Sequence, residues 1–541
     1  MKAICQTGSF EAFSMYNAIY VDKTELIYSL VSLPNRIFIS RPRRFGKSLT
    51  LDTIATLFET GVEPYFKGTW IYDKWTEPTY PVLRLNFLNF DKNSIEKFNN
   101  KLNSKITEFA ELNHVTSYKE KEEAEDSIDH LLEQLRLENR QIVILIDEYD
   151  CQMTANINNE ALYKQFQEKI KSFYAHLKDK LAIKFLGITG VTRLKDVEIF
   201  SIGSDINDIT NDSAYSQMIG FTRDEIKKYY IDYLKLAASY ENNCTVDNVT
   251  EAQIESLLDR LAKNYDGYCF DEFYKKKVFS TWSVNKFFQS VVSNKFVYFG
   301  EYWYDNGGLP SILVNYLKTH ELNIFEYLDK DKFLKVSSDD FKNPTALTTI
   351  NQNVLMCQTG YLTLRSDLNK TSTVALGIPN GEIYKALNRL LANNIFKGNT
   401  DITDDYGRSL LEVGTVDDII NLFNSALNSV SYDNYPIVSE SSVQNMLKLY
   451  LLGAHQKVLS ELHEAKGRAD LVVNTDNRRI VFEFKYAKNE TEAKSKLLDA
   501  VEQIKTRDYG NIVPKKTELL RIAAVFNADP KVRAFTEYQK V

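Results

Sequence analysis

The stretch RIFISRPRRFGKSLTLD at residues 36–52 decides the fold of the first half of the chain. Its first five residues form an apolar run typical of a buried strand, and apolar side chains then recur at helical spacing. The loop between these elements ends in Gly46, Lys47 and Ser48. At such a strand-to-helix turn, backbone N–H groups and the helix dipole converge on a phosphate, while the lysine and the hydroxyl reach the outer phosphates and Mg²⁺. The pattern therefore predicts a phosphate-binding loop.

The loop departs from the phosphate-loop motif at its first position. The motif reads G-x-x-x-x-G-K-[ST], and Arg41 stands where its first glycine belongs. Pro42 follows, so we expect the front of the loop to be stiffer than usual. Arg41, Arg43 and Arg44 become candidates for phosphate, acidic-partner or inter-domain contacts. The nucleotide-binding residues that we predict in the loop are Arg44, Gly46, Lys47, Ser48 and Leu49.

A second motif, IVILIDEYD at residues 142–150, supports the first because it ends an apolar strand in carboxylates. Asp147 at the tip can reach Mg²⁺ through water, and Glu148 can polarise an attacking water. One strand, PVLRLNF at 81–87, lies between the two motifs in sequence. This order fits the additional-strand class of P-loop ATPases, whose motifs lie on non-adjacent strands. We predict Ser48 and Asp147 as metal ligands and Glu148 as a catalytic residue.

The next strand, LAIKFLGITG at 181–190, runs into a polar loop, and this region holds Thr189 and Arg193. A polar side chain at this place could sense the γ-phosphate, and the arginine could contact it or a neighbouring subunit. A threonine that caps a turn would give the same sequence, so a structural origin stays open. We predict both residues as part of the nucleotide site.

A separate set of charged residues lies near the end of the chain, in ADLVV (469–473) and RIVFEFK (479–485). Residues i and i+2 of a strand share one face, so Glu483 and Lys485 point together. If the two strands pair as a hairpin, Asp470 lies beside Glu483, and two carboxylates can hold Mg²⁺ or Mn²⁺. The metal and the lysine would position a water for attack on a phosphodiester. We predict all three residues as catalytic and the two carboxylates as metal ligands.

Spacing alone leaves this site open, because E-x-K on an exposed strand face is common. Glu461 is a candidate for a further metal ligand, and Gln503 lies on the following helix. The formal net charge of −7 excludes a general basic field, so a nucleic acid must be held by a local patch. The residues that could form such a patch, or be ordinary solvated charges, include Lys457, Lys466, Arg468, Lys488, Lys494 and Lys496.

The amino-acid composition indicates which cellular compartment to expect for the protein. The five cysteines are scattered without a C-x-x-C pair, which indicates a reducing compartment rather than a disulfide framework or a zinc site. The first residues lack the apolar core of a signal peptide, and no uncharged apolar run approaches the ~20 residues that span a bilayer. The sequence therefore predicts a cytoplasmic protein without a membrane segment.

The order of apolar segments predicts an α/β architecture. Strands alternate with helices in the first part, which favours a mainly parallel sheet, and helices rich in Lys, Tyr and Asn follow from about residue 221. The segments at 354–364 and 372–380 are expected to form a hairpin. The last part reads helix, two strands, helix and strand. The domains that we predict are 1–220, 221–435 and 436–541.

Together these segments resemble a bacterial family that joins an AAA-ATPase-like domain to a PD-(D/E)XK, restriction-endonuclease-like domain. The resemblance spans nearly the whole chain. It rests on YVDKTELI (20–27), RPRRFGKSLTLD (41–52), LIDEYD (145–150), ITGVTRLKDVEIFS (188–201), YDGYCF (265–270), VLMCQTGYLTL (354–364), LGIPNGEIYKAL (376–387), KGRADLVV (466–473) and VFEFKYAK (481–488). In that family the loop characteristically reads R-P-R-R-F-G-K-S, so the missing glycine is the family's own form.

The resemblance implies an ATPase and a Mg²⁺-dependent nuclease on one chain, with ATP and Mg²⁺ as cofactors and Mn²⁺ as a substitute at the nuclease site. Asp470, Glu483 and Lys485 fall on the acidic, acidic and lysine positions of the nuclease superfamily without substitution. The implied partner is nucleic acid, DNA rather than RNA, and a homo-oligomer is one assembly that the architecture allows. The architecture also suggests defence against foreign DNA or an association with mobile elements.

Two functions stay open at the level of the sequence. In the first, ATP binding or hydrolysis changes the domain arrangement and licenses nucleic-acid cleavage by the C-terminal site. In the second, the chain is a nucleotide-dependent switch or scaffold whose C-terminal domain binds nucleic acid or protein without cleaving. The sequence also leaves open whether ATP is hydrolysed or only bound.

Overall fold

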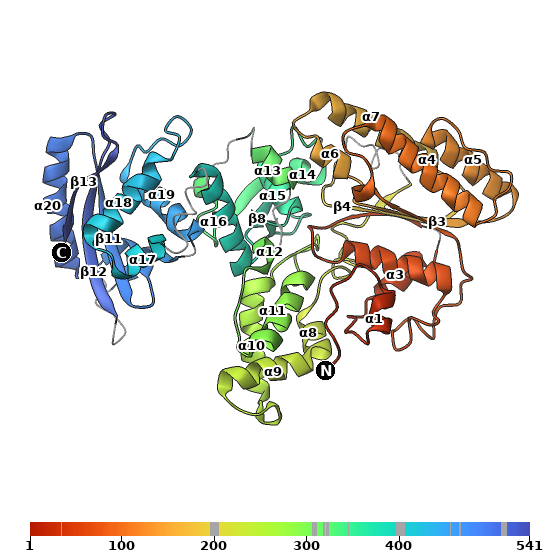
Figure 1. Cartoon of the computed structure of the whole chain (residues 1–541), viewed down its shortest axis with the longest axis horizontal. Helices are drawn as coiled ribbons and strands as arrows, with labels where there is room; N and C mark the ends of the chain where they lie inside the picture. Colours follow the sequence, from red (N-terminus) through yellow and green to blue (C-terminus); the bar gives the residue numbers. More distant parts are fainter. Residues whose placement is uncertain are drawn as a thin grey trace. The chain divides into compact units, whose positions relative to one another are not determined.

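The computed structural model describes all residues except 34, 195–204, 306–310, 318–319, 321–323, 345, 397–405, 455, 465–466 and 510–516. It also leaves out the side chains of residues 304–305, 311, 325, 406, 408, 457, 459–464 and 467. The chain forms two compact units, residues 1–320 with 333–383 and residues 321–332 with 384–541 (Figure 1). The three-domain boundaries expected from the sequence stay a prediction. No helix among the described residues is long and apolar enough to cross a bilayer.

The first unit is built on a five-stranded parallel sheet with the order β2-β3-β4-β1-β5. Its strands are β1 (Asn35–Ser40), β2 (Val82–Asn86), β3 (Ile142–Asp147), β4 (Ile183–Gly190) and β5 (Asn207–Asp208). The register pairs Ser40 with Gly190 and Asn86 with Asp147, so the carboxyl ends of these strands meet at one edge. The predicted α/β fold with a parallel sheet is confirmed. Strand β4 separates β1 from β3, so the two motifs lie on non-adjacent strands.

Helices cover both faces of this sheet, which explains why every residue of β3 and β4 is buried. Figure 1 shows α4 (Ile95–Leu112), α5 (Ala124–Leu137) and α7 (Glu160–Leu177) on one face and α3 (Lys47–Thr60) on the other. The shorter helices of this part are α1 (Glu11–Met15), α2 (Thr24–Val31) and α6 (Cys151–Ala155).

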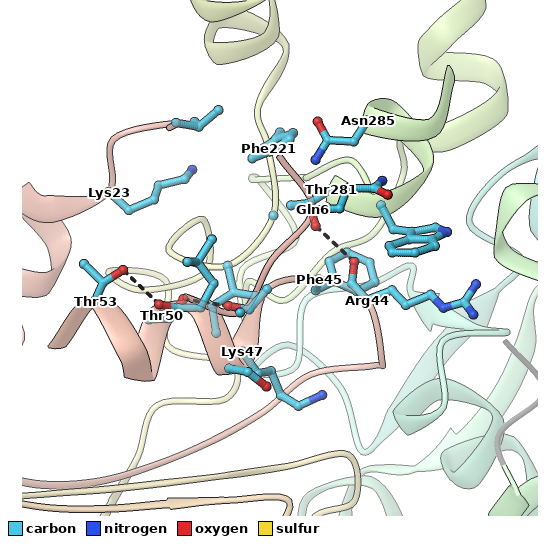
Figure 2. Close-up of a pocket in the computed structure, with 18 of the residues that line it drawn as sticks. Gln6, Lys23, Arg44, Phe45, Lys47, Thr50, Thr53, Phe221, Thr281 and Asn285 are labelled. Atoms are coloured by element: carbon cyan, nitrogen blue, oxygen red, sulfur yellow. Dashed lines mark hydrogen bonds between the residues drawn. The ribbon is translucent and has the colours of Figure 1, made fainter. Parts of the chain in front are cut away.

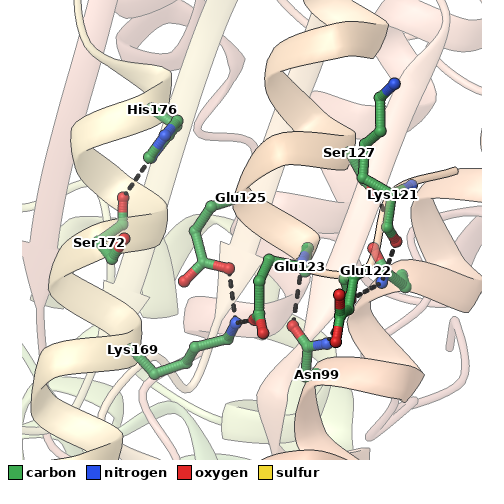
Figure 3. Close-up of polar contacts among 11 residues, drawn as sticks. Asn99, Lys121, Glu122, Glu123, Glu125, Ser127, Lys169, Ser172 and His176 are labelled. Carbon is green, nitrogen blue, oxygen red and sulfur yellow. Dashed lines mark hydrogen bonds and ion pairs between the residues drawn. The ribbon is translucent and has the colours of Figure 1, made fainter.

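An ion cluster, in which Lys169 and Glu125 are buried and Glu123 is exposed, joins α5 to α7 beside a hydrogen bond to α4 (Figure 3). Lys169 of α7 is 9% exposed, and its ammonium lies 2.5 Å from a carboxylate oxygen of both Glu123 and Glu125 at the start of α5. Asn99 of α4 accepts a hydrogen bond from the Ala124 N–H at 3.0 Å. The amide thus satisfies a backbone donor that has no partner within its own helix.

A helical part follows the sheet in the first unit, so the predicted helical middle region is confirmed. Its helices are α8 (Arg223–Tyr229), α9 (Ile231–Asn242), α10 (Glu251–Tyr265), α11 (Thr281–Asn294), α12 (Tyr302–Asp305) and α13 (Ser311–Leu317). Capping boxes at Thr222 and Thr250 begin α8 and α10. The apolar faces of α8 to α11 form a core that also takes in Ile19 and Val21 from the N-terminal segment.

A small antiparallel sheet with the order β6-β8-β7 also lies in this unit. Its elements and neighbours are β6 (Leu334–Ser337), α14 (Ser338–Lys342), α15 (Gln352–Gln358), β7 (Thr363–Leu364) and β8 (Thr373–Gly377). The hairpin expected at 354–364 is wrong for most of that stretch, because α15 takes its first part and only β7 pairs with β8. Periodicity cannot distinguish a short buried helix from a buried strand. The next helix, α16 (Gly381–Ile395), contains the sequence boundary between the units.

The second unit contains a five-stranded sheet with the order β13-β12-β11-β10-β9. Its elements are α17 (Tyr406–Val413), α18 (Val416–Asn428), α19 (Glu440–Gly453), β9 (Lys457–Glu464), β10 (Gly467–Asn474), β11 (Arg478–Ala487), α20 (Glu490–Arg507), β12 (Glu518–Asn527) and β13 (Ala534–Lys540). Val481 packs in a core with residues of α20, while the neighbouring Phe482 packs on Phe423 of α18, so helices cover both faces. The predicted helix-strand-strand-helix-strand order is present, and the edge strands β9 and β13 add to it.

Candidate active sites

The phosphate loop joins β1 to α3, and its backbone is left-handed at Arg44 (φ 69°) and Gly46 (φ 108°). The side chain of Lys47 is 4% exposed. Its ammonium donates to the carbonyl oxygens of Arg41 at 3.0 Å and Pro42 at 3.3 Å. The lysine therefore curls back into the loop, and its donors face loop carbonyls that a phosphate oxygen could replace.

Side chains from the start of α3 and from the ends of β3 and β4 converge beside the loop. The Ser48 hydroxyl donates to Asp147 Oδ2 at 2.6 Å, and the Thr189 hydroxyl donates to Asp147 Oδ1 at 2.5 Å. Carboxylate and hydroxyl oxygens are ligands that suit Mg²⁺, so the residues present fit this ion. The structure brings the three predicted residues together, and their roles at a nucleotide stay predictions.

Glu148 follows Asp147 in a left-handed backbone conformation (φ 54°). One of its carboxylate oxygens lies 4.0 Å from the Lys47 ammonium. Burial raises the pKa of Glu148, although the charge of Lys47 opposes this shift. A raised pKa suits a carboxylate that accepts a proton from water. Glu148 lines the same cavity as the phosphate loop.

Arg41, which takes the place of the first glycine, points into the protein interior. Its side chain is 1% exposed, and its guanidinium donates to the Thr210 carbonyl at 2.6 Å. The guanidinium carbon lies 4.2 Å from the centre of the Phe270 ring. Burial lowers the pKa of Arg41 to about 9. Arg41 therefore anchors the end of β1 to the segment that follows β5.

Arg44 connects the loop to the helical part. Its guanidinium donates to the Trp303 carbonyl at 2.8 Å, and its own carbonyl accepts from the Thr281 hydroxyl at 3.0 Å. The buried Glu382 accepts from the Ser283 hydroxyl at 2.7 Å and from the Trp303 N–H at 2.8 Å. Burial raises the pKa of Glu382 to about 8. These bonds fix Arg44 to α11 and α12, and a contact between Arg44 and nucleotide stays a prediction.

Of the two remaining predicted nucleotide ligands, one lines the cavity over the loop and the other does not. Leu49, in the first turn of α3, lines the cavity above the loop. Arg193 forms an ion pair with Asp208 of β5 and donates to the Lys342 carbonyl of α14. A role for Arg193 at the γ-phosphate stays a prediction. Residues 195–201 of the matching sequence block lie outside the described residues.

A cavity of about 430 Å³ lies over the loop within the first unit (Figure 2). Residues 43–50 and Glu148 form one wall. The other walls come from residues 5–8 of the N-terminal segment, from residues 218–221 and from α11. The volume is in the range of small-molecule sites. The sequence did not predict these other walls, because they carry no phosphate-binding motif.

Long-range hydrogen bonds hold the N-terminal segment over the cavity. The Tyr233 hydroxyl of α9 donates to the Lys2 carbonyl at 2.7 Å. The Phe10 N–H donates to Asp52 of α3 at 2.7 Å. An ideal Cβ on Gly8 would lie 3.9 Å from Ser48 Cβ, so the segment passes closely over the phosphate loop. The segment therefore links α3 to the helical part.

The antiparallel β10–β11 hairpin brings the three predicted C-terminal residues together. Its register pairs Leu471 with Phe482, so Asp470 and Glu483 are neighbours across the two strands. Asp470 Oδ2 accepts from the Phe484 N–H at 2.8 Å. The Lys485 ammonium lies 2.9 Å from Glu483 Oε1. The hairpin assumed from the sequence is therefore present, and the catalytic roles stay predictions.

The charge environment of this site suits an added cation. Glu483 is fully buried, and its Oε2 has no hydrogen-bond partner among the described atoms. Burial, and then the charge of Asp470, raises the pKa of Glu483 to about 7. Burial also raises the pKa of Asp470. A buried carboxylate oxygen without a partner is costly, and a divalent cation would satisfy it. The residues present therefore fit Mg²⁺ or Mn²⁺.

Glu440 is a neighbour of the site that the motifs of the sequence did not predict. Glu440 lies in the first turn of α19, and its Oε1 is 3.4 Å from the Lys485 ammonium. The sequence signal for Glu440 is its position directly after Ser439, the residue that caps the start of α19. Gln503 donates to the Tyr509 hydroxyl at 3.3 Å.

The candidate Glu461 and Lys466 lie outside the described side chains. Among the described residues, no group of three or more His, Cys, Asp or Glu side chains is arranged to hold a metal ion. The described carboxylates at the hairpin therefore account for only part of a metal's ligands.

Comparison with known protein families matches the chain in two regions, each of which contains one of the candidate sites. Residues 5–200 match the family described as "Predicted AAA-ATPase", and residues 438–535 match the PD-(D/E)XK nuclease superfamily. The chain therefore combines an AAA-ATPase-like domain with a domain of the PD-(D/E)XK nuclease superfamily.

Among particular proteins, the chain is similar to one from Azotobacter chroococcum mcd 1, described as "Uncharacterized protein in vnfD 5'region". The two are 25% identical over 527 residues, which cover 95% of this chain and 93% of the relative. Among solved structures, the crystal structure of Cdc6p from Pyrobaculum aerophilum matches with 11% identity and a TM-score of 0.22. That match covers 68% of this chain and 92% of the Cdc6p chain.

Proposed function

We propose that this protein binds and hydrolyses ATP in the cavity of the first unit and cleaves nucleic acid, DNA in preference to RNA, at the β10–β11 hairpin. The observation that carries the proposal is the pairing of half-buried Asp470 with buried Glu483 beside Lys485, with one oxygen of Glu483 left without a partner among the described atoms. Both reactions need a divalent metal. A part in defence against foreign DNA or mobile elements agrees with this pairing of domains.

At the ATP site, different residues of the chain would bind the phosphates, hold the metal and activate the water. Bound Mg²⁺ would neutralise charge on the β- and γ-phosphates. Lys47 would exchange its loop carbonyls for phosphate oxygens, and Ser48 and Asp147 would hold the ion. Glu148, whose pKa burial raises, orients the attacking water and takes its proton.

At the hairpin, Asp470 and Glu483 would hold the metal, which lowers the pKa of a bound water and polarises the phosphate. Lys485 keeps its positive charge, because Glu483 and Glu440 raise its pKa more than burial lowers it. Its ammonium can therefore donate a hydrogen bond to a phosphate oxygen as negative charge develops there.

The test measures ATP turnover and cleavage of a DNA and RNA panel by the purified protein, with Mg²⁺ or Mn²⁺ and with or without ATP. Glu483→Ala should abolish cleavage and leave ATP binding intact, and Lys47→Ala should abolish ATP binding. Glu490→Ala, which removes an exposed glutamate of α20, is the matched control. Absence of cleavage on every substrate in both metals would show that the nuclease part of the proposal is wrong.

One observation favours a second candidate function, a nucleotide-dependent switch whose C-terminal domain binds without cleaving. The described residues supply no cluster of three metal-binding side chains at the hairpin. Tight DNA binding without products, unchanged in Lys485→Ala, would support this function. Loss of cleavage in the same variant would support the nuclease.

A further inference from the structure

The cavity over the phosphate loop has a second end whose polar group has no assigned role. Figure 2 shows Lys47 at one side of the cavity and Asn285 at the other, close to Phe221 in the view. Both Asn285 and Phe221 contact the buried Tyr230. A nucleoside triphosphate is an elongated molecule, so a γ-phosphate at Lys47 leaves its base for the opposite end.

Tyr230 fixes the orientation of the Asn285 side chain. The Tyr230 hydroxyl donates to Asn285 Oδ1 at 2.5 Å. Tyr230 itself is 1% exposed and stacks on Phe288 with ring centres 5.2 Å apart. Because Oδ1 is engaged, the amide nitrogen of Asn285 remains a free donor, and among the described residues it donates to no protein atom.

The surroundings of this donor suit a flat aromatic ligand. Ile19, Val21 and Ile27 line the cavity together with the ring of Phe221. Apolar walls with a small number of placed polar groups are typical of sites that orient a small ligand. A purine base offers such walls two flat faces, and its ring nitrogens are hydrogen-bond acceptors at its edge.

We propose that Asn285 recognises the base of the bound nucleotide by donating its amide N–H to a ring nitrogen of a purine, adenine in ATP. This inference rests on the proposed ATP binding and adds the group that reads the base. Tyr230 acts as a positioning residue, since it holds the amide with its nitrogen toward the cavity. The phosphate loop then supplies affinity for any triphosphate, and Asn285 adds affinity for the base.

The test compares the dissociation constants of ATP, CTP and inorganic tripolyphosphate. Asn285→Ala should weaken ATP binding about three- to tenfold, the value of one neutral hydrogen bond, and leave tripolyphosphate binding unchanged. Tyr230→Phe should weaken ATP binding by a smaller factor. Asn294→Ala is the matched control, because Asn294 lies on the same helix and is exposed.

A set of deaza-ATP analogues, each lacking one ring nitrogen, tests the unmodified protein directly. One analogue should bind more weakly than ATP to the unmodified protein and equally well to Asn285→Ala. An equal loss of ATP and tripolyphosphate binding in Asn285→Ala would overturn the inference, and so would equal binding of all analogues by the unmodified protein. If the unmodified protein binds neither ATP nor tripolyphosphate, the proposed ATP binding itself is wrong.

Discussion

Arg44 adopts a left-handed backbone in a loop where glycine is the usual residue for such a conformation. A non-glycine residue there costs about 1 kcal/mol or more, so other contacts have to offset this cost. The guanidinium donates to the Trp303 carbonyl and lies over the Trp282 ring, 4.8 Å from its centre. The Thr281 hydroxyl also binds the Arg44 carbonyl. The helical part therefore stabilises a loop conformation that the loop's own sequence disfavours.

Two substitutions of Arg44 distinguish loop geometry from phosphate contact. Arg44→Ala keeps the backbone strain and loses the side-chain bonds, whereas Arg44→Gly loses the bonds and removes the strain. In thermal melts, we expect Arg44→Gly to be more stable than Arg44→Ala by about 1 kcal/mol. We also expect Arg44→Gly to lose less ATP affinity than Arg44→Ala. Equal losses of affinity in both variants would indicate that the guanidinium contacts phosphate.

Glu382 predicts a pH dependence of stability. Burial raises the pKa of this carboxyl to about 8, so the folded state favours its neutral form. The stabilisation is complete below the ordinary pKa of glutamate, near 4.5, and is lost as the pH rises through 8. Glu382→Gln keeps a neutral side chain at every pH. We expect nearly equal melting temperatures for variant and parent at pH 4 and a more stable variant at pH 9, by up to about 5 kcal/mol. A variant less stable at pH 9 would show that the ionised carboxylate stabilises the fold.

At the scale of elements, Lys169 should contribute more to the free energy of unfolding than the other lysines of its helix. It is the cation of a buried cluster, and its loss leaves the buried Glu125 carboxylate without a partner charge. We expect Lys169→Ala to lower the free energy of unfolding by about 3–5 kcal/mol in urea titrations. Lys164→Ala on the same helix removes an exposed pair with Glu160 and should cost under about 0.5 kcal/mol. Similar losses in the two variants would contradict the importance of burial.

The strands with apolar runs were predictable from the sequence, including the edge strand β2, whereas β5, β9 and β13 were not. Strands β1 to β4 and β10 to β12 contain apolar runs bounded by polar turns, a pattern that burial requires. By contrast, β5 has only two residues, and the edge strand β13 is mixed in polarity because a strand at an edge is less covered. The motif residues of both sites were predictable, because their chemistry fixes their spacing. Glu440 and Asn285 reach the sites only through tertiary packing, which no local pattern encodes.

At the scale of the whole molecule, each ligand should stabilise one unit. The first unit contains the cavity and the phosphate loop, and the second contains the β10–β11 carboxylates, each with its own apolar core. We therefore expect two calorimetric transitions. ATP with Mg²⁺ should raise the melting temperature of the first unit's transition. At a free ATP concentration a hundred times the dissociation constant, binding stabilises that unit by about 2.7 kcal/mol. Lys47→Ala should abolish the shift. Mn²⁺ without ATP should raise the melting temperature of the second unit's transition, and Glu483→Ala should remove this shift. A single transition that both ligands shift would show cooperative unfolding of the entire chain.

The hydrogen bond from Tyr233 to the Lys2 carbonyl joins residues 231 positions apart, and Gln289 contacts the Ile4 carbonyl across 285 positions. A ribosome adds about 5–20 residues per second, so roughly 10 to 50 seconds separate the synthesis of the first pair of partners. During this interval the segment over the phosphate loop has no α9 or α11 to bind. The parallel sheet ends at Asp208, before α9 and α11 are synthesised, so the nascent chain can fold the sheet before it can enclose a nucleotide. ATP capture therefore becomes available only after α11 (Thr281–Asn294) has left the ribosome, shortly after the middle of the 541-residue chain has been synthesised.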